Sequence, residues 1–232
     1  MSPAGKQVIV HVGANSTDEA VTLARHASKC GVHAISALPP GAAYSFSEIR
    51  DYYAVLASAV DIPLLIYYFP TFAPKIESTD QFLELCQIPN VIGLKFTHSN
   101  LFTMHEIKRR GHCILYGNDE MLVSGLLMGA DGGIGTTYNL IPEEYLRLYE
   151  FAMAGNWSEA LVVQSQVNEL IDVILRFPVL PAVKLMLQWQ GIDCGSSIRP
   201  RRDLTDSEMM DLKKRLGDTQ LGRKRWATLP VA

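Results

Sequence analysis

Six short apolar runs, each followed by an amphipathic segment, fill the first 139 residues of this sequence. The pattern begins with QVIVHVG at 7–13 and TDEAVTLARHASKC at 17–30, and its sixth run is GGIGTTYN at 132–139. Short apolar runs bounded by turn residues are typical of strands, and apolar residues three and four apart are typical of helices. A strand that alternates with a helix predicts a parallel sheet covered by helices. We therefore expect an α/β fold of about six βα units.

The remaining residues divide into a helical part and a tail. Residues 140–218 have a helical pattern throughout, and the stretch LTDSE predicts that Thr205 or Asp206 caps the last helix. The final residues, LGRKRWATLPVA, are basic and then apolar, so residues 219–232 are expected to be a tail unlike a helix end. No linker separates residues 1–139 from 140–218, and one structural domain is expected.

Composition narrows the class of protein. The chain has 232 residues, 48% of them hydrophobic, which is enough for a sizeable core, and its net charge of −3 offers no basic footprint for nucleic acid. The first residues do not resemble a secretory signal, and no stretch approaches the roughly 18 apolar residues that span a membrane. Four scattered cysteines lack metal-site or disulfide spacing. We expect a cytoplasmic protein that binds neither nucleic acid nor a membrane.

Polar residues gather where the later strands end. In parallel α/β folds the ligand site lies at the carboxyl ends of the strands, so these residues are the candidates for function. With a side-chain period of two, Gly93, Lys95 and Thr97 share one strand face. No GxGxxG or GxxxxGK[ST] phosphate loop is present, which argues against nucleotide binding. The candidates are Tyr67; Lys95 and Thr97; Gly117, Asp119 and Glu120; and Gly135, Thr136 and Thr137.

Lys95 is unusual because it lies inside an apolar run, VIGLKFTHSN at 91–100. An amine enclosed in an apolar interior loses its proton more readily than one in water, and a neutral amine can attack a carbonyl to form a Schiff base. A nearby phenol such as that of Tyr67 can shuttle the proton that carbon–carbon cleavage requires. This pair of residue types predicts chemistry on a carbonyl compound.

Plainer interpretations of the same residues remain open. Lys95 can be an edge residue whose amine reaches water, and Tyr67 can be a packing residue. Asp119 and Glu120 can cap the next helix, and the glycines of GGIGTTYN can serve a tight turn. The three histidines that recur every seven residues cross different elements, so no metal site is expected from them; they are His98, His105 and His112.

Four motifs together resemble a known family. They are YYFP at 67–70, GLKFT at 93–97, GNDE at 117–120 and GADGGIGTTYN at 129–139. The chain resembles the N-acetylneuraminate lyase branch of the pyruvate-dependent class I aldolases, a superfamily shared with dihydrodipicolinate synthase. This resemblance implies a (β/α)8 TIM barrel with extra C-terminal helices, usually a homotetramer, that needs no metal or organic cofactor.

The resemblance also implies residue roles and a reaction. Lys95 would be the Schiff-base lysine and Tyr67 the acid/base tyrosine, as catalytic residues. The implied reaction of carbohydrate metabolism is the reversible cleavage of N-acetylneuraminate to pyruvate and N-acetylmannosamine. The positions that would hold the sugar portion are Thr97, Gly117, Asp119, Glu120, Gly135 and Thr136.

The sequence departs from the family pattern in two places. The family's first two βα units, with their GxTGE-type loop for the pyruvate carboxylate, have no counterpart, so we expect an incomplete barrel of doubtful activity. The segment LPPGAAYSF at 38–46 is one residue short of the family's aromatic run and leaves Tyr44 as the substitute. Two alternatives follow: a non-catalytic truncated isoform that associates with full-length subunits, or an aldolase for another 2-keto-3-deoxy sugar acid.

Overall fold

The chain forms two compact units. The computed structural model describes residues 5–41, 44–71, 73 and 76–226. The first unit comprises Met1–Asn118 and Ser124–Ile134, and the second comprises Asp119–Val123 and Gly135–Ala232. Among the described helices, none combines the length and apolar character that crossing a bilayer requires.

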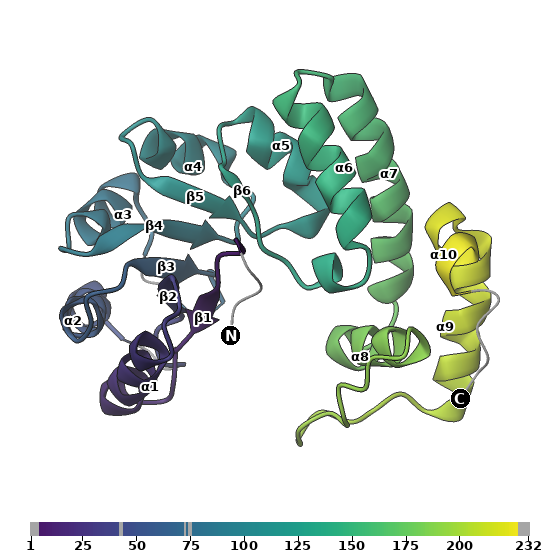
Figure 1. The fold of residues 1–232 in the computed structure, drawn as a ribbon, viewed down its shortest axis with the longest axis horizontal. Helices are drawn as coiled ribbons and strands as arrows, with labels where there is room; N and C mark the ends of the chain where they lie inside the picture. Colours follow the sequence, from purple (N-terminus) through teal and green to yellow (C-terminus); the bar gives the residue numbers. More distant parts are fainter. Residues whose placement is uncertain (1–4, 42–43, 72, 74–75, 227–232) are drawn as a thin grey trace. The chain divides into compact units, whose positions relative to one another are not determined.

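The first unit is built around a six-stranded parallel sheet (Figure 1). The strands lie in the order of the sequence, from β1 to β6, and every neighbouring pair is parallel. This arrangement confirms the predicted α/β fold of six βα units. The strands are β1 (Ile9–His11), β2 (Ala34–Ala37), β3 (Leu64–Tyr68), β4 (Val91–Phe96), β5 (Cys113–Tyr116) and β6 (Gly132–Gly133).

Helices α1 to α4 lie along one face of this sheet (Figure 1). A side chain caps the start of each of these four helices by accepting from a backbone N–H in its first turn; the caps are Ser16, Ser45, Ser78 and Asn100. Such caps satisfy amides that have no partner inside a helix, so the loop sequences set where each helix begins. The helices are α1 (Thr17–Lys29), α2 (Phe46–Ser58), α3 (Thr79–Cys86) and α4 (Leu101–Lys108), followed by α5 (Leu122–Leu127).

The two faces of the sheet differ in burial. Four side chains on the face opposite Lys95 and Tyr67 are 0% exposed; they are Ile66, Leu94, Phe96 and Ile114. Lys95 and Tyr67, on the opposite face, are only half-buried. Burial on this second face is uneven, because Leu65, two residues before Tyr67, is 2% exposed. Strands β1 and β6 each pair on one side only within the described residues, so the sheet does not close around this face.

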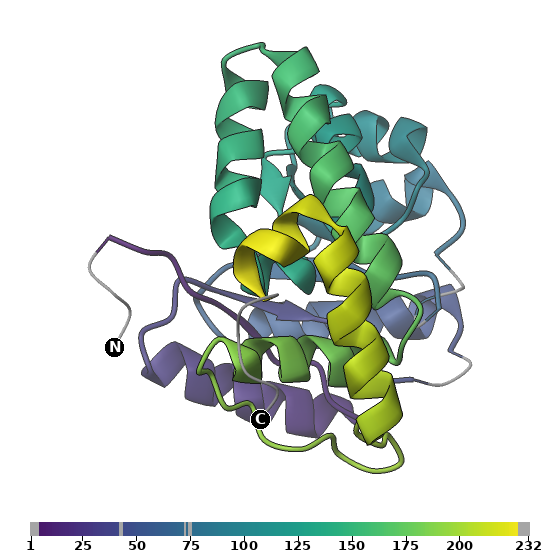
Figure 2. The ribbon, with the colours of Figure 1, turned by 90° about the vertical axis from the view of Figure 1, so that its right-hand side faces the viewer.

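The second unit is helical (Figure 2). Helix α7 packs along α6 and also contacts α8, α9 and α10. Thr205 caps α9 in a capping box with Glu208, which confirms the predicted helix start. The elements are the 3-10 turns η1 (Asp119–Met121) and η2 (Thr137–Asn139), and the helices α6 (Pro142–Met153), α7 (Trp157–Ile174), α8 (Val179–Trp189), α9 (Asp206–Asp218) and α10 (Gln220–Arg225).

Helix α10 corrects the prediction for the tail. Residues 219–232 were expected to be a tail unlike a helix end, but Thr219 caps a helical turn by accepting from the amide of Gly222 at 2.9 Å. Trp226 directly follows this helix and is completely buried. The basic and apolar residues of this segment thus belong to a helix and to the buried tryptophan that follows it. Residues 227–232 lie outside the described residues.

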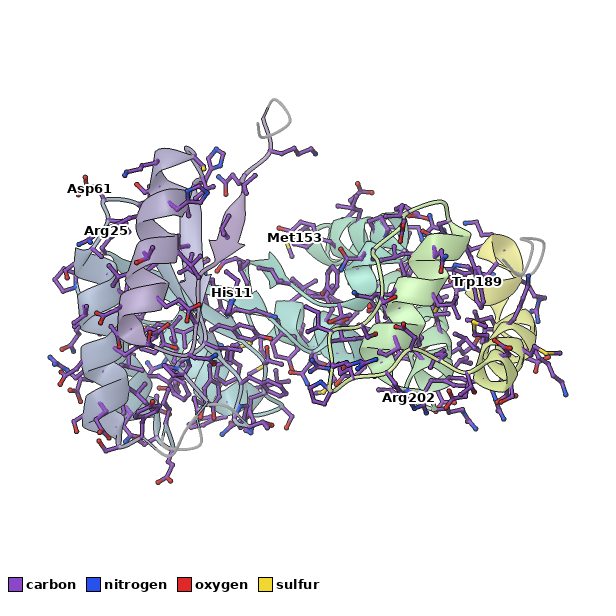
Figure 3. The ribbon with its side chains drawn as sticks, turned by 90° about the horizontal axis from the view of Figure 1, so that it is seen from below. His11, Arg25, Asp61, Met153, Trp189 and Arg202 are labelled. Atoms are coloured by element: carbon purple, nitrogen blue, oxygen red, sulfur yellow. The ribbon has the colours of Figure 1, made fainter. Side chains whose placement is uncertain are left out.

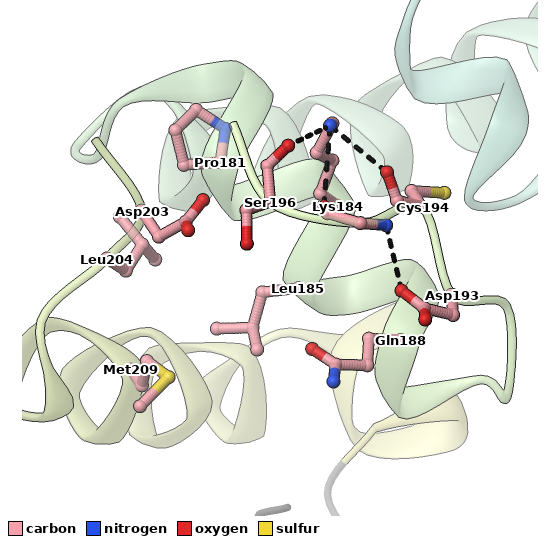
Figure 4. A pocket seen from close by; sticks show the side chains of 11 residues that line it. Pro181, Lys184, Leu185, Gln188, Asp193, Cys194, Ser196, Asp203, Leu204 and Met209 are labelled. Atoms are coloured by element: carbon pink, nitrogen blue, oxygen red, sulfur yellow. Dashed lines mark hydrogen bonds between the residues drawn. The ribbon is translucent and has the colours of Figure 1, made fainter. Parts of the chain in front are cut away.

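Lys184, on helix α8, binds backbone carbonyl groups of the loop that follows this helix (Figure 4). The ammonium of Lys184 donates to the carbonyl oxygens of Cys194, Gly195 and Ser196, at 3.1, 3.4 and 2.9 Å. The loop and helix enclose a cavity of about 320 Å³, which Pro181 and Met209 also line. Lys184 therefore has a structural role in holding successive carbonyls together.

Candidate active site

Strand β4 carries the central candidate and is fixed at its start by Asn90. The Asn90 side chain donates to the carbonyl oxygens of Ala57, Val60 and Ile62, at 3.2, 3.0 and 2.8 Å. Its backbone has φ of 71°, a conformation that asparagine tolerates better than most residues. One side chain thus ties the loop before β3 to the start of β4, which sets the position of both strands.

Gly93 allows β4 to lie close to β5. A Cβ atom at this position would collide with the backbone carbonyl of Cys113 on β5. The register also shifts by one residue between β3 and β4, just before Gly93. After the shift, Tyr67 is paired with Lys95. The glycine and the shift together bring these two side chains side by side on one face.

Lys95 and Tyr67 are in direct contact. The Lys95 Nζ lies 3.8 Å from the centre of the Tyr67 ring. An ammonium over an aromatic face is attracted by the ring's electron density, so the pair is held together without a hydrogen bond. An amine beside a phenol on half-buried strand ends can attack a carbonyl compound and exchange protons with it.

His11 belongs to the same group, although none of the four sequence motifs contains it. It ends β1 (Figure 3), and its ring meets the Tyr67 ring edge-on at 6.0 Å between centres. Its Nε2 accepts the backbone N–H of Leu38 at 3.2 Å. Partial burial first, and the charge of Lys95 second, lower the pKa of His11, which favours the neutral ring. Its place at a strand end, two residues before Gly13, was a usable signal.

Thr97 and Gly117 are also adjacent. A Cβ at Gly117 would collide with Oγ1 of Thr97, and the Gly117 N–H donates to the carbonyl of Phe96 at 2.9 Å. The Thr97 hydroxyl is buried without a hydrogen-bond partner among the described residues. A buried hydroxyl of this kind is available to a ligand. These two predicted residues belong to the first unit, as do Lys95 and Tyr67.

Asp119 organises a loop of the second unit. Its Oδ2 accepts from the backbone N–H and the hydroxyl of Thr137, at 2.8 and 2.6 Å, and Thr137 Oγ1 lies 2.5 Å from the Tyr145 hydroxyl. Burial first, and the charge of Asp119 second, raise the pKa of Tyr145, so its hydroxyl remains a donor. A Cβ at Gly135 would collide with the Asp119 carboxylate. Asp119 and Gly135 are thus in contact, and the carboxylate fixes the start of η2.

The remaining predicted residues, Glu120 and Thr136, are exposed. The backbone around Glu120 is held by α7, because Asn168 donates to the Glu120 carbonyl and Gln164 to the Asp119 carbonyl, both at 3.1 Å. The structure therefore brings together Tyr67 with Lys95, Thr97 with Gly117, and Asp119 with Gly135. The substrate-binding roles of these residues stay predictions.

The described residues contain no group of three or more histidine, cysteine or acidic residues that could hold a metal ion. Two of the three histidines considered from the sequence engage backbone groups: His98 accepts from the amide of Asn100, and His105 contacts the carbonyl of Met128. These contacts give both histidines local structural roles.

The fold and the lysine–tyrosine pair define the class of protein. A parallel βα sheet with helices on one face and reactive side chains at its strand ends is the architecture of a (β/α)8 barrel, here with six units. The chain belongs to the dihydrodipicolinate synthetase family, whose model matches residues 5–218. This confirms the family resemblance drawn from the four motifs.

Individual relatives support the same assignment. The chain is 37% identical over 211 residues to N-acetylneuraminate lyase of Rhizobium meliloti, covering 89% of this chain and 70% of the relative. It is 38% identical over 217 residues to N-acetylneuraminate lyase 2 of Escherichia coli O6:H1, covering 90% and 71%. The solved structure of Ruminococcus gnavus sialic acid aldolase matches with a TM-score of 0.89 and 30% identity, over 97% of this chain and 77% of that one. A catalytic lysine mutant of that aldolase has also been solved.

Proposed function

We propose that this chain is a class I carbon–carbon lyase that cleaves N-acetylneuraminate reversibly to pyruvate and N-acetylmannosamine. The observation that carries the proposal is the contact of Lys95 with Tyr67, 3.8 Å from amine to ring centre, at the ends of two parallel strands. The names of the relatives supply the substrate. A metal or organic cofactor has no step in this chemistry.

In the proposed reaction Lys95 acts as the nucleophile. Its neutral amine attacks the C2 carbonyl of the open-chain sugar acid, and loss of water leaves an iminium. Cleavage of the C3–C4 bond sends its electron pair into this iminium, which becomes an enamine, while the C4 hydroxyl gives up its proton. Protonation at C3 and hydrolysis then release pyruvate and return the Lys95 amine.

Tyr67 is proposed to carry the proton. Its oxygen accepts the proton of the C4 hydroxyl while its own proton passes to the substrate carboxylate, and the reverse relay delivers a proton to C3 of the enamine, as a positioned acid/base group does. Strand pairing places Tyr67 beside Lys95. This preorganisation favours the role, because the two groups need little further ordering when the sugar binds.

The sugar portion is proposed to be bound by Thr97, Gly117, Asp119, Glu120, Gly135 and Thr136, as the family resemblance implies. The unpartnered hydroxyl of Thr97 supports its part in this set. For Asp119, whose Oδ2 already binds Thr137, the proposed contribution includes shaping the loop that carries Thr136. The same resemblance leads us to propose a homotetramer in the cytoplasm.

Pyruvate release from N-acetylneuraminate tests this proposal. The wild-type sequence and Lys95→Arg are compared, each preceded by the two N-terminal βα units of the Rhizobium meliloti relative. The guanidinium of the variant stays protonated and cannot form an iminium. We expect release by the wild type alone, and preference for N-acetylneuraminate over a 2-keto-3-deoxy sugar acid without an acetamido group. Equal rates for wild type and variant would contradict the lyase assignment, and a reversed preference would contradict the substrate.

A further inference from the structure

Helix α10 carries a basic edge that contacts the start of α6. Lys224 Nζ lies 3.2 Å from Glu144 Oε1, and Arg225 forms an ion pair with Glu143. Arg225 also donates to the carbonyl oxygen of Leu140. These contacts join residues about 80 positions apart in the sequence. Lys224 and Arg225 therefore have specific acidic and carbonyl partners within the second unit.

Leaving the buried carboxylate of Glu144 without a cation would destabilise the fold. Glu144 is only 4% exposed, and Arg147 NH2 lies 2.9 Å from its other carboxylate oxygen. A buried carboxylate is tolerated when cations and hydrogen bonds compensate it, and removing one partner is strongly destabilising. Lys224 and Arg147 supply that compensation, so the start of α6 depends on α10.

Two anchors fix the position of α10 itself. At its start, the side chain of Thr219 is buried and caps the helix. At its end, Trp226 is fully buried and its indole Nε1 donates to the carbonyl of Met186 at 3.0 Å. A tryptophan buried with its N–H satisfied holds the adjacent backbone in one place. Arg225, next to this anchor, is thereby directed toward Leu140.

Leu140 is the point at which this contact reaches the candidate site. Its side chain is fully buried, and its carbonyl also accepts from Gln190 Nε2 at 3.2 Å. The residue ends the loop that begins at Gly135 and includes Thr136. Asp119 holds the same loop from within, through Thr137. The loop is therefore fixed at its middle by a carboxylate and at its end by an arginine and a glutamine.

We propose that α10 is a positioning element for the loop at residues 135–140, and that Arg225 acts on sugar binding through the Leu140 carbonyl and the start of α6. This inference rests on the proposed function, because the role of Gly135 and Thr136 in holding the sugar is part of that function. Arg225 touches no reacting atom, so its effect is on the geometry of the loop. Misplacement of a binding group by about 1 Å can cost roughly 100-fold.

The matched pair of variants is Arg225→Ala and Arg223→Ala. Both remove an arginine from the same short helix, but Arg223 donates to the carbonyls of Gly217 and Asp218 rather than to the loop. Hydrogen exchange is followed at the amides of Thr137, Asn139 and Leu140. The first donates to the Asp119 carboxylate, and the other two donate to carbonyl oxygens within the loop. We expect at least about tenfold faster exchange at these amides in Arg225→Ala, and wild-type exchange in Arg223→Ala.

Kinetics separate positioning from general stability. In Arg225→Ala we expect the KM for N-acetylneuraminate to rise by about tenfold. This is below the roughly 100-fold loss that a displacement of a binding group by about 1 Å can cause. Borohydride trapping of pyruvate at Lys95 should stay at the wild-type level, since that lysine belongs to β4 of the first unit. Arg225→Lys keeps a cation opposite Glu143, so its KM should lie between those of the wild type and Arg225→Ala. If Arg225→Ala does not fold, Arg225→Lys replaces it in the comparison with Arg223→Ala.

Two results would overturn the inference. One is equal loop exchange in the two alanine variants; the other is a raised KM in Arg223→Ala as large as that in Arg225→Ala. Failure of the proposed function has a different signature, namely no pyruvate release by the wild type. In that case the exchange comparison still decides whether α10 holds the loop.

Discussion

The Lys95 amine lies 3.8 Å above the ring of Tyr67, and the two residues are register partners on neighbouring parallel strands. They are 28 positions apart in the sequence, so strand pairing alone creates the contact. Because both residues lie on strands, the proposed proton-transfer group and the proposed nucleophile need no loop movement to meet.

Tyr67→Phe should keep the ring under Lys95 and remove only the hydroxyl. We expect borohydride trapping with pyruvate to remain close to wild type, while turnover of N-acetylneuraminate falls by roughly 10²–10⁴-fold, the range for a lost acid/base group. The matched control is Tyr68→Phe, because the Tyr68 hydroxyl binds the carbonyl of Ile76 at 3.4 Å on the other strand face. Turnover that is equal in the two variants would return Tyr67 to a packing role.

The neutral state of His11 should depend on Lys95. Burial is the larger cause of its lowered pKa and the charge of Lys95 the smaller one, so Lys95→Met should raise the pKa of His11 but leave it below the ordinary value of 6.5. Proton NMR titration of the ring measures this, with His11→Gln to assign the signal. An unchanged pKa would show that the amine does not act on this ring.

The same shift predicts a pH dependence of stability. A lowered folded-state pKa means that the unfolded chain binds the proton more tightly. The contribution of His11 is therefore fully present above pH 6.5 and is lost as the pH falls through the window below it. The difference in melting temperature between wild type and His11→Gln should therefore become smaller as the pH is lowered from 8 to 5.

Much of this architecture could be predicted from local pattern. The six strands follow from apolar runs of strand length, and the meeting of Tyr67 with Lys95 follows from the rule that parallel strands end at one edge. Helix α10 could not be predicted, because its basic residues are stabilised by Glu143 and Glu144, far away in the sequence. Likewise, nothing local indicates that Asp119 holds Thr137. Long-range polar contacts leave no periodic signal.

The open sheet predicts how the 232-residue chain behaves when produced alone. Strands β1 and β6 end the sheet with unpaired edges among the described residues, and such edges pair with other chains. Preceding the chain with two βα units of the Rhizobium meliloti relative should raise the melting temperature, reduce light scattering and increase pyruvate release by more than about tenfold. A soluble chain that melts cooperatively and matches the extended protein in activity would contradict this expectation.

The most direct test of the account is the site of covalent trapping. The chain, preceded by the same two βα units, is incubated with saturating pyruvate and borohydride, digested, and sequenced by mass spectrometry, with Lys95→Arg and Lys108→Arg as matched variants. Lys108 is the control because its ammonium binds Asp131 at 2.6 Å, away from strand β4. The account predicts a reduced pyruvate adduct on Lys95 that disappears in Lys95→Arg and persists in Lys108→Arg. An adduct on a different lysine, with Lys95 unmodified, would contradict it.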